Sequence, residues 1–341
     1  MNILSETILW MCQNFFLQQS DEYMTAQLNG EHTLLELCEV SRTFSVKNGL
    51  FGEKKSLKAV DRVSLTLHEG ECVGLVGESG CGKSTLGKLA CGLLAPSRGE
   101  VRFMNRPLPL AGAGSWAAGK IQMVFQDPYS SLNPRMTVAA SVAEPLLACG
   151  VKKEERLQRA QDMLRKVGLS AVEKRYPHEF SGGQRQRIVV ARALITKPSV
   201  IICDEPVSAL DASVQAQVIN LLLDMQDAFG FAYLFISHDL NVVGFLCDRI
   251  VVMYLGRIVE EGPKERIFEN PLHPYTKALL SARAGEDGER YILQGELPSP
   301  VDLPKGCAFH PRCPKANDIC LKDEPDLRLL DHAHHVRCHL I

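Results

Sequence analysis

The spacing of hydrophobic residues changes several times along the chain, and each change predicts a different element. Residues 34–37 open a strand, and Val63, Leu65 and Leu67 alternate with polar residues in a second strand. Residues 47–58 between them are rich in glycine and lysine and predict a surface hairpin loop. Short apolar runs predict further strands at 73–76, 101–103, 121–125, 200–204 and 233–236.

Helical periodicity follows several of these strands. A helix is predicted directly after the strand at 73–76, from the spacing of Leu86, Leu89, Ala90 and Leu93, and another at 188–194. Residues 136–176 predict a group of helices, because apolar residues repeat at helical spacing with charges between them: Val138, Val142, Leu146, Leu157, Met163, Leu164 and Val167. Strands alternating with helices predict an α/β fold, here with an all-α insertion at about 130–185.

The composition is that of a globular protein. The 341 residues leave room for two domains, and 45% of them are hydrophobic. Because 38 Lys and Arg balance 40 Asp and Glu, no basic field predicts a nucleic-acid partner. No run approaches the roughly 18 apolar residues of a membrane-spanning helix. Most of the 12 cysteines are scattered in apolar runs, so we interpret them as small buried hydrophobic residues of a cytosolic protein.

The first 20 residues form an apolar, roughly helical stripe. The stripe lacks the basic region and the cleavage site of a signal peptide, and its polar face has no Lys or Arg to bind anionic lipid. An interfacial helix is one interpretation. We favour a translation start at Met24, which makes residues 1–23 an artefact of start-site choice. In either case we expect residues 1–31 to be an extension that precedes the main domain.

A glycine-rich stretch between the strand at 73–76 and the following helix has the spacing G-x-x-x-x-G-K-[ST]. Backbone N–H groups of such a loop, together with the free N-terminus of the helix, bind nucleotide phosphates. Lys83 is expected to reach the β- and γ-phosphates, and the Ser84 hydroxyl to ligate Mg²⁺. The predicted phosphate-binding residues are Gly77, Glu78, Ser79, Gly80, Cys81, Gly82, Lys83, Ser84 and Thr85.

Polar side chains follow three of the other predicted strands. Two carboxylates end the strand at 200–204, and burying them is costly unless they are used. We expect Asp204 to hold Mg²⁺ through water and Glu205 to polarise the water that attacks the γ-phosphoryl group. Gln126 could reach the Mg²⁺ or that water. His238, also at a strand end, is a candidate sensor of the γ-phosphate.

Two further stretches allow a binding role without requiring one. Phe44 could stack on an adenine ring, or it could be an exposed strand residue. The stretch Ser181, Gly182, Gly183 and Gln184 begins the predicted helix at 188–194 with a fair N-cap and two glycines. It could form a second phosphate-binding helix N-terminus, or it could be an ordinary helix start after a glycine turn.

Taken together, these segments resemble the ATP-binding subunits of ABC transporters in order and spacing, over residues 34 to 341. The stretches 131–135, 176–179, 273–276 and 295–300 resemble the oligopeptide, dipeptide and nickel importer branch, most closely the second ATPase of its pair. One departure is Phe180, where leucine is usual. The resemblance implies a P-loop ATPase fold with an antiparallel β subdomain. It also implies a nucleotide-binding domain at 32–285 and a C-terminal extension at 286–341.

The resemblance also implies a mechanism. ATP and Mg²⁺ are held between the phosphate loop of one subunit and the Ser181–Gln184 signature of another, in a head-to-tail dimer with a paralogous ATPase. Phe44 then stacks on adenine, Gln126 senses Mg²⁺, Glu205 is the general base and His238 supports it. Asp211 belongs to the same site through the stretch 208–211. The implied partners are two permease subunits and, indirectly, a solute-binding protein at the bacterial inner membrane, with the helical insertion facing the permease.

Four cysteines lie in the last 35 residues, in a proline-rich segment with little apolar content: Cys307, Cys313, Cys320 and Cys338. A metal would stabilise so small an appendage. Their spacing is not the usual paired spacing of zinc sites, and the resemblance favours a [4Fe–4S] cluster. Zinc, a mixed site with the nearby histidines, and unliganded thiols remain alternatives.

Two other functions compete with import. One is a soluble ABC protein that remodels ribosomes or DNA, but such chains usually carry two nucleotide domains or a coiled-coil insertion. The other is a redox- or iron-sensing regulatory subunit. The cargo stays open between dipeptides, oligopeptides, nickel chelates and metallophores, because the permease and the binding protein select it.

Overall fold

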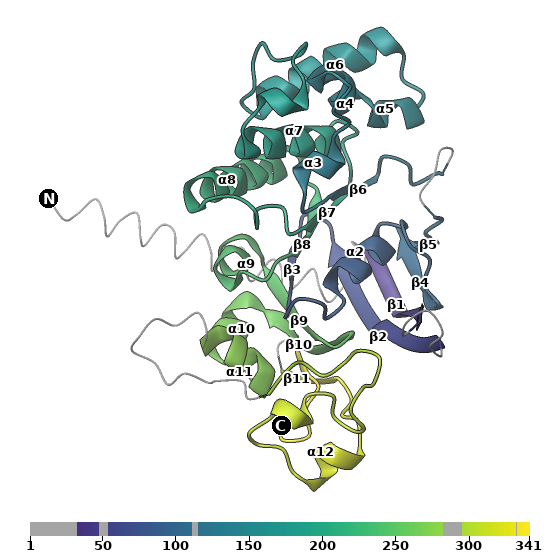
Figure 1. Cartoon of the computed structure of the whole chain (residues 1–341), viewed down its shortest axis with the longest axis vertical. Helices are drawn as coiled ribbons and strands as arrows, with labels where there is room; N and C mark the ends of the chain where they lie inside the picture. Colours follow the sequence, from purple (N-terminus) through teal and green to yellow (C-terminus); the bar gives the residue numbers. More distant parts are fainter. Residues whose placement is uncertain (1–32, 48–53, 111–114, 282–294, 332) are drawn as a thin grey trace, which may run out of the picture.

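The computed structural model describes residues 33–47, 54–110, 115–281, 295–331 and 333–341. The expectations for residues 1–31 and for a start at Met24 therefore lie outside the described residues. Two sheets and the helices packed around them make up the described part of the fold (Figure 1). No helix of the described part is both long and apolar enough to cross a bilayer.

The first sheet is antiparallel and has the order β2-β1-β4-β5. Its strands are β1 (Thr33–Lys47), β2 (Lys54–His68), β4 (Arg98–Phe103) and β5 (Arg106–Pro107). The predicted alternation in β2 is confirmed, since Val63, Leu65 and Leu67 are all buried. The loop predicted at 47–58 is too long, because Lys54 to Lys58 pair with β1 and belong to the strand.

The second sheet has the order β11-β12-β10-β9-β3-β8-β7-β6. Its strands are β3 (Cys72–Val76), β6 (Ile121–Val124), β7 (Val200–Asp204), β8 (Ala232–Ile236), β9 (Arg249–Tyr254), β10 (Arg257–Pro263), β11 (Arg328–Asp331) and β12 (His334–Val336). The strands from β6 to β9 are parallel, whereas β10, β12 and β11 continue the sheet antiparallel. Strands β3, β7, β8 and β9 are buried throughout, as continuous apolar runs in a sheet covered on both faces should be.

Alternate residues of these strands enter two different cores. Val73 and Leu75 face the core shared with the antiparallel sheet and with α2 (Lys83–Ala90). Cys72 and Val76 face the opposite core, which is covered by the longer helices. Those helices are α6 (Lys153–Lys166), α7 (Gly182–Leu194) and α8 (Ala212–Phe229).

The remaining helices are short. They are α3 (Pro128–Ser131), α4 (Val138–Ala143), α5 (Pro145–Ala148), η1 (Pro177–Glu179), α9 (Leu240–Leu246), α10 (Lys264–Glu269), α11 (Pro274–Ser281), η2 (His310–Arg312) and α12 (Asp318–Lys322). The predicted helical region at 136–176 is thus confirmed as several helices. The helices α4, α5 and α6 lie at one end of the central sheet, and the C-terminal residues lie at the opposite end (Figure 1).

Two residues of the predicted apolar stripes are not buried. Leu93 is exposed because α2 ends at Ala90 and Gly92, at a φ of 73°, turns the chain away from the helix face. Leu157 is exposed as well, since the buried stripe of α6 begins only at Ala160.

The C-terminal segment is not the irregular appendage that its proline content predicts. Strand β12 pairs with β10 and so extends the central sheet. Phe309 is buried against the Tyr254 and Tyr275 rings, with centroids 5.3 and 5.5 Å away. The segment therefore adds its apolar residues to the main core instead of forming one of its own.

Candidate nucleotide site

The phosphate loop connects the end of β3 to the start of α2, and its glycines are required by close backbone contacts. Gly77 and Gly82 have φ angles of 153° and 110°. A Cβ at Gly77 would lie 2.2 Å from the Met253 carbonyl oxygen, and one at Gly82 would lie 2.1 Å from the Ala59 carbonyl oxygen. Only glycine fits at these two positions, because a side chain would collide with the neighbouring backbone. The loop can therefore pack against these neighbours and leave its own backbone exposed.

Lys83 lies inside this loop. Its side chain is buried, and Nζ donates hydrogen bonds to the carbonyl oxygens of Gly77 at 2.8 Å and Glu78 at 3.0 Å. No side chain caps the N-terminus of α2, which leaves the first N–H groups of the helix available to an anion. A positive charge and free N–H groups thus lie together at one point.

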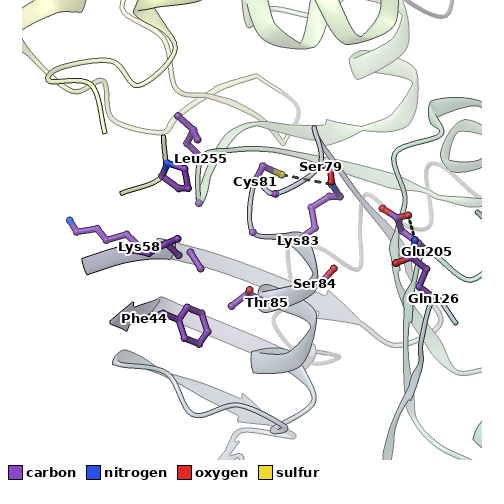
Figure 2. A pocket seen from close by; sticks show the side chains of 16 residues that line it. Phe44, Lys58, Ser79, Cys81, Lys83, Ser84, Thr85, Gln126, Glu205 and Leu255 are labelled. Atoms are coloured by element: carbon purple, nitrogen blue, oxygen red, sulfur yellow. Dashed lines mark hydrogen bonds between the residues drawn. The ribbon is translucent and has the colours of Figure 1, made fainter. Parts of the chain in front are cut away.

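A cavity of about 360 Å³ lies against the loop, between β1, β2 and the end of β7 (Figure 2). Ten of its lining residues are among those that the sequence predicts: Phe44, Ser79, Gly80, Cys81, Gly82, Lys83, Ser84, Thr85, Gln126 and Glu205. Six are not: Leu57, Lys58, Ala59, Leu255, Gly256 and Pro300. These six carry no local sequence signal, because they reach the cavity only through the pairing of distant segments. Gly77, Glu78, Asp204 and His238 are predicted site residues that are not among those lining the cavity.

Ser84, which lines this cavity, pairs with Asp204, which is not among the lining residues. The Ser84 hydroxyl donates to Asp204 Oδ1 at 2.9 Å. Asp204 ends a fully buried strand, and burial raises the pKa of its carboxyl group, against the opposing effect of the Ser84 hydrogen bond. A carboxylate and a hydroxyl are ligands that suit Mg²⁺, and a bound cation would favour the ionised carboxylate.

Glu205 brings the other predicted polar residues together. Its Oε2 accepts a hydrogen bond from Gln126 Nε2 at 3.1 Å and lies 3.3 Å from His238 Nδ1. Gln126 also donates to the Ser208 hydroxyl at 3.3 Å. The Glu205 backbone has a φ of 49°, a strained conformation for a residue other than glycine. Such strain at a strand end is typical of a residue that is held in position for function.

Phe44 lines the outer part of the cavity and is half-buried. The Arg42 guanidinium lies over its ring, 4.9 Å from the centroid. The ring therefore already has a planar group against one face. An aromatic ring that stacks on adenine makes a contact of the same kind.

The signature and Asp211 do not take part in this cavity. Ser181 caps α7, where its hydroxyl accepts from the Gln184 N–H at 3.4 Å and its own N–H donates to Gln184 Oε1 at 3.1 Å. Asp211 caps α8, and its Oδ1 accepts from the Val214 N–H at 3.0 Å. Gly183 is tightly packed, since a Cβ there would lie 2.2 Å from the Val214 side chain. None of these residues is among the described residues that line the cavity.

The four C-terminal cysteines approach one another. The Cys307 N–H donates to the Cys320 carbonyl oxygen at 2.9 Å, and Cys320 and Cys338 are buried. Burial raises the pKa of Cys307 to about 11, against the lowering effect of a hydrogen bond at the Phe309 backbone, and the nearby thiols of the other three add to the rise. In the described part of the chain, however, no three His, Cys, Asp or Glu side chains lie close enough to hold a metal ion. The predicted metal site at these cysteines, whether an iron–sulfur cluster or zinc, is therefore not supported by the side-chain positions of the described residues.

A phosphate loop and strand-end carboxylates beside a central sheet covered on both faces are the features of an ATP-binding cassette. The chain is an ABC-type ATPase. Residues 60–208 match the ABC transporter family, and residues 259–320 match the family described as oligopeptide/dipeptide transporter, C-terminal region. The chain belongs to the oligopeptide and dipeptide transport ATP-binding proteins of this family.

Relatives cover almost the whole chain. It is 48% identical to the oligopeptide transport ATP-binding protein AppF of Bacillus subtilis over 322 residues, which are 91% of this chain and 98% of AppF. It is also 48% identical to the dipeptide transport ATP-binding protein DppF of Escherichia coli over 312 residues, 89% of this chain and 93% of DppF.

Solved structures share the cassette. One is cbiO1 from Clostridium perfringens, part of the ABC transporter complex cbiONQ, with a TM-score of 0.60 and 28% identity over 70% of this chain and 92% of cbiO1. Another is the dimeric cassette MJ0796 in a post-hydrolysis state with ADP and Pi, with a TM-score of 0.59 and 31% identity over 68% of this chain and 99% of MJ0796.

Proposed function

We propose that this chain powers the import of dipeptides or oligopeptides across the bacterial inner membrane, as one of a pair of ATPases. The observation that carries this proposal is the match of residues 259–320 to the peptide-importer C-terminal region, together with a phosphate loop and the strand-end carboxylate Glu205 around one cavity. The names of the relatives support peptides as cargo. Nickel chelates are the alternative cargo.

The active site is completed by a second subunit. The phosphate loop supplies one side, whereas the signature Ser181–Gln184 lies outside the cavity of its own chain. A head-to-tail dimer brings the signature and Asp211 of one subunit to the ATP of the other. The dimeric state of MJ0796 supports this arrangement. A paralogous ATPase is the proposed partner.

Hydrolysis follows from the groups around Glu205. Glu205 takes a proton from the attacking water, and His238 holds the Glu205 carboxylate in position. Gln126 donates to the same carboxylate oxygen and helps to hold it. Ser84, Asp204 and Gln126 would hold Mg²⁺, which would neutralise charge on the phosphates. Lys83 binds the β- and γ-phosphates, and Phe44 stacks on adenine.

The subunit lies on the cytoplasmic face of the membrane, bound to two permease subunits. Within the domain at 32–285, the insertion at about 130–185 contacts the permease, and residues 286–341 form the extension specific to peptide importers. A solute-binding protein acts indirectly, by delivering the peptide to the permease.

The test is reconstitution with the permease pair and the partner ATPase in proteoliposomes, with the solute-binding protein supplied on the opposite side of the membrane. Uptake of labelled dipeptides and oligopeptides is expected only with Mg²⁺–ATP inside the compartment that contains this subunit. Permease pair and partner without this chain are the control. Uptake of a nickel chelate without uptake of peptide would overturn the cargo assignment.

The four C-terminal cysteines are proposed to hold a [4Fe–4S] cluster. Burial raises the pKa of Cys307, Cys313 and Cys338, and the nearby Cys320 thiol adds to the rise in each. Four cysteine thiolates are the ligand set of such a cluster. The thiolates would supply the four outer iron ligands, and the cluster would add stability to the extension.

Anaerobically purified protein is expected to contain about four irons and four acid-labile sulfides per chain. Serine at positions 307, 313, 320 and 338 should remove both the iron and the visible absorbance. Serine at the exposed Cys149 and the half-buried Cys38 is the matched control and should change neither. Iron content that is the same in wild type and quartet variant would leave free thiols as the correct assignment.

A further inference from the structure

Glu78, within the phosphate loop, is held by residues from the far end of the chain. Its backbone N–H donates to the Tyr275 hydroxyl at 2.8 Å. Its carboxylate accepts two hydrogen bonds from Arg312, Nη1 to Oε2 at 2.6 Å and Nη2 to Oε1 at 3.0 Å. Tyr275 lies in α11 and Arg312 ends η2, so two separate elements fix one residue of the loop.

The ion pair is shielded from solvent on the arginine side. The Arg312 side chain is 6% exposed and the Glu78 side chain 29%. The hydrogen bonds to Glu78 raise the pKa of Arg312 above its usual value. A guanidinium that binds both oxygens of a carboxylate fixes orientation as well as distance, which lysine cannot do. The pair thus determines where Glu78 lies and how its side chain is turned.

Packed aromatic rings make the attachment rigid. Phe309, three residues before Arg312, is buried between Tyr254, Tyr275 and His273, with ring centroids 5.3, 5.5 and 5.4 Å away. The His273 Nδ1 accepts the Tyr275 N–H at 3.0 Å. Both groups that hold Glu78 are therefore anchored in one aromatic cluster.

We propose that Arg312 and Tyr275 are positioning residues for ATP binding, which act by fixing the phosphate loop through Glu78. Lys83 Nζ donates to the Glu78 carbonyl oxygen, so the orientation of Glu78 also sets the position of the lysine. A loop already held in its binding conformation loses less entropy when ATP binds. Arg312 also neutralises a carboxylate that would otherwise repel the polyphosphate. The inference rests on the proposed nucleotide site.

The test measures the dissociation constant of Mg²⁺–ATP for the full-length chain, with a fluorescent ATP analogue. Arg312→Gln, Arg312→Lys and Tyr275→Phe are each expected to raise it about three- to tenfold. In the assembled transporter, KM for ATP should rise and kcat should stay within about twofold. The double variant Arg312→Gln with Glu78→Gln should bind ATP no more weakly than Arg312→Gln alone, because both act through one contact.

Glu324→Gln is the matched control. Glu324 is 31% exposed and pairs with Arg62 at 2.7 Å and Arg257 at 2.5 Å, so it joins the C-terminal segment to the core through residues outside the phosphate loop. Its replacement should lower the melting temperature without changing the affinity for ATP. Wild-type affinity in Arg312→Gln and Tyr275→Phe, or an equal loss in Glu324→Gln, would overturn the proposal. Unchanged affinity in Lys83→Ala would instead show that the nucleotide site itself is wrongly assigned.

Discussion

Glu205→Gln is expected to bind ATP as tightly as the wild type and to hydrolyse it at least about a hundredfold more slowly. The amide keeps the shape of the side chain and can still contact Gln126 and His238, but it cannot accept a proton from water. Binding depends on the phosphate loop, which the substitution does not touch. Steady-state phosphate release by the assembled transporter, measured beside nucleotide affinity, separates the two effects.

Asp127→Asn is the control for Glu205→Gln. Asp127 is an exposed carboxylate that follows Gln126 directly, and it caps α3 by accepting from the Tyr129 N–H at 2.9 Å. Asparagine can still cap the helix, so this variant should hydrolyse ATP within about twofold of the wild type. If Glu205→Gln also turned over at the wild-type rate, another group would have to be the base.

Lys83→Ala is expected to weaken ATP binding about 10- to 100-fold, because hydrogen bonds to a charged partner contribute roughly 1.5–3 kcal/mol. The loss should appear in the isolated subunit, since Lys83 lies in the phosphate loop of its own chain. Lys153→Ala, at the exposed start of α6, removes the same charge far from the loop and should leave affinity unchanged. Equal affinities in the two variants would contradict the assigned role of Lys83.

The local parts of the site could be predicted from the sequence. The phosphate loop and the carboxylates at the end of β7 are contiguous stretches, and their residue types and spacing indicate their chemistry. Strand-end residues such as Gln126 and His238 follow because neighbouring parallel strands end at the same edge of a sheet. The correct fold class is therefore enough to predict that Gln126, Glu205 and His238 lie close together.

The other parts depend on contacts between distant segments. Leu255 and Pro300 reach the cavity only because β9 lies beside β3 and the C-terminal segment returns to the core. The pair of Glu78 and Arg312 spans 234 positions. Neither residue spacing nor composition predicts such a contact. The proline content of the C-terminal segment predicts irregular structure, so the strand β12 that joins the central sheet was not predicted.

Pro300 in the cavity wall limits how this protein can be recombined with its relatives. Residues 295–341 look like a module that could be exchanged between homologous importers to build chimeric subunits. Because Pro300 of that module lines the candidate nucleotide cavity, an exchange would also alter the pocket proposed to bind ATP. A functional chimera must therefore carry over the segment together with the strands and loop that face it.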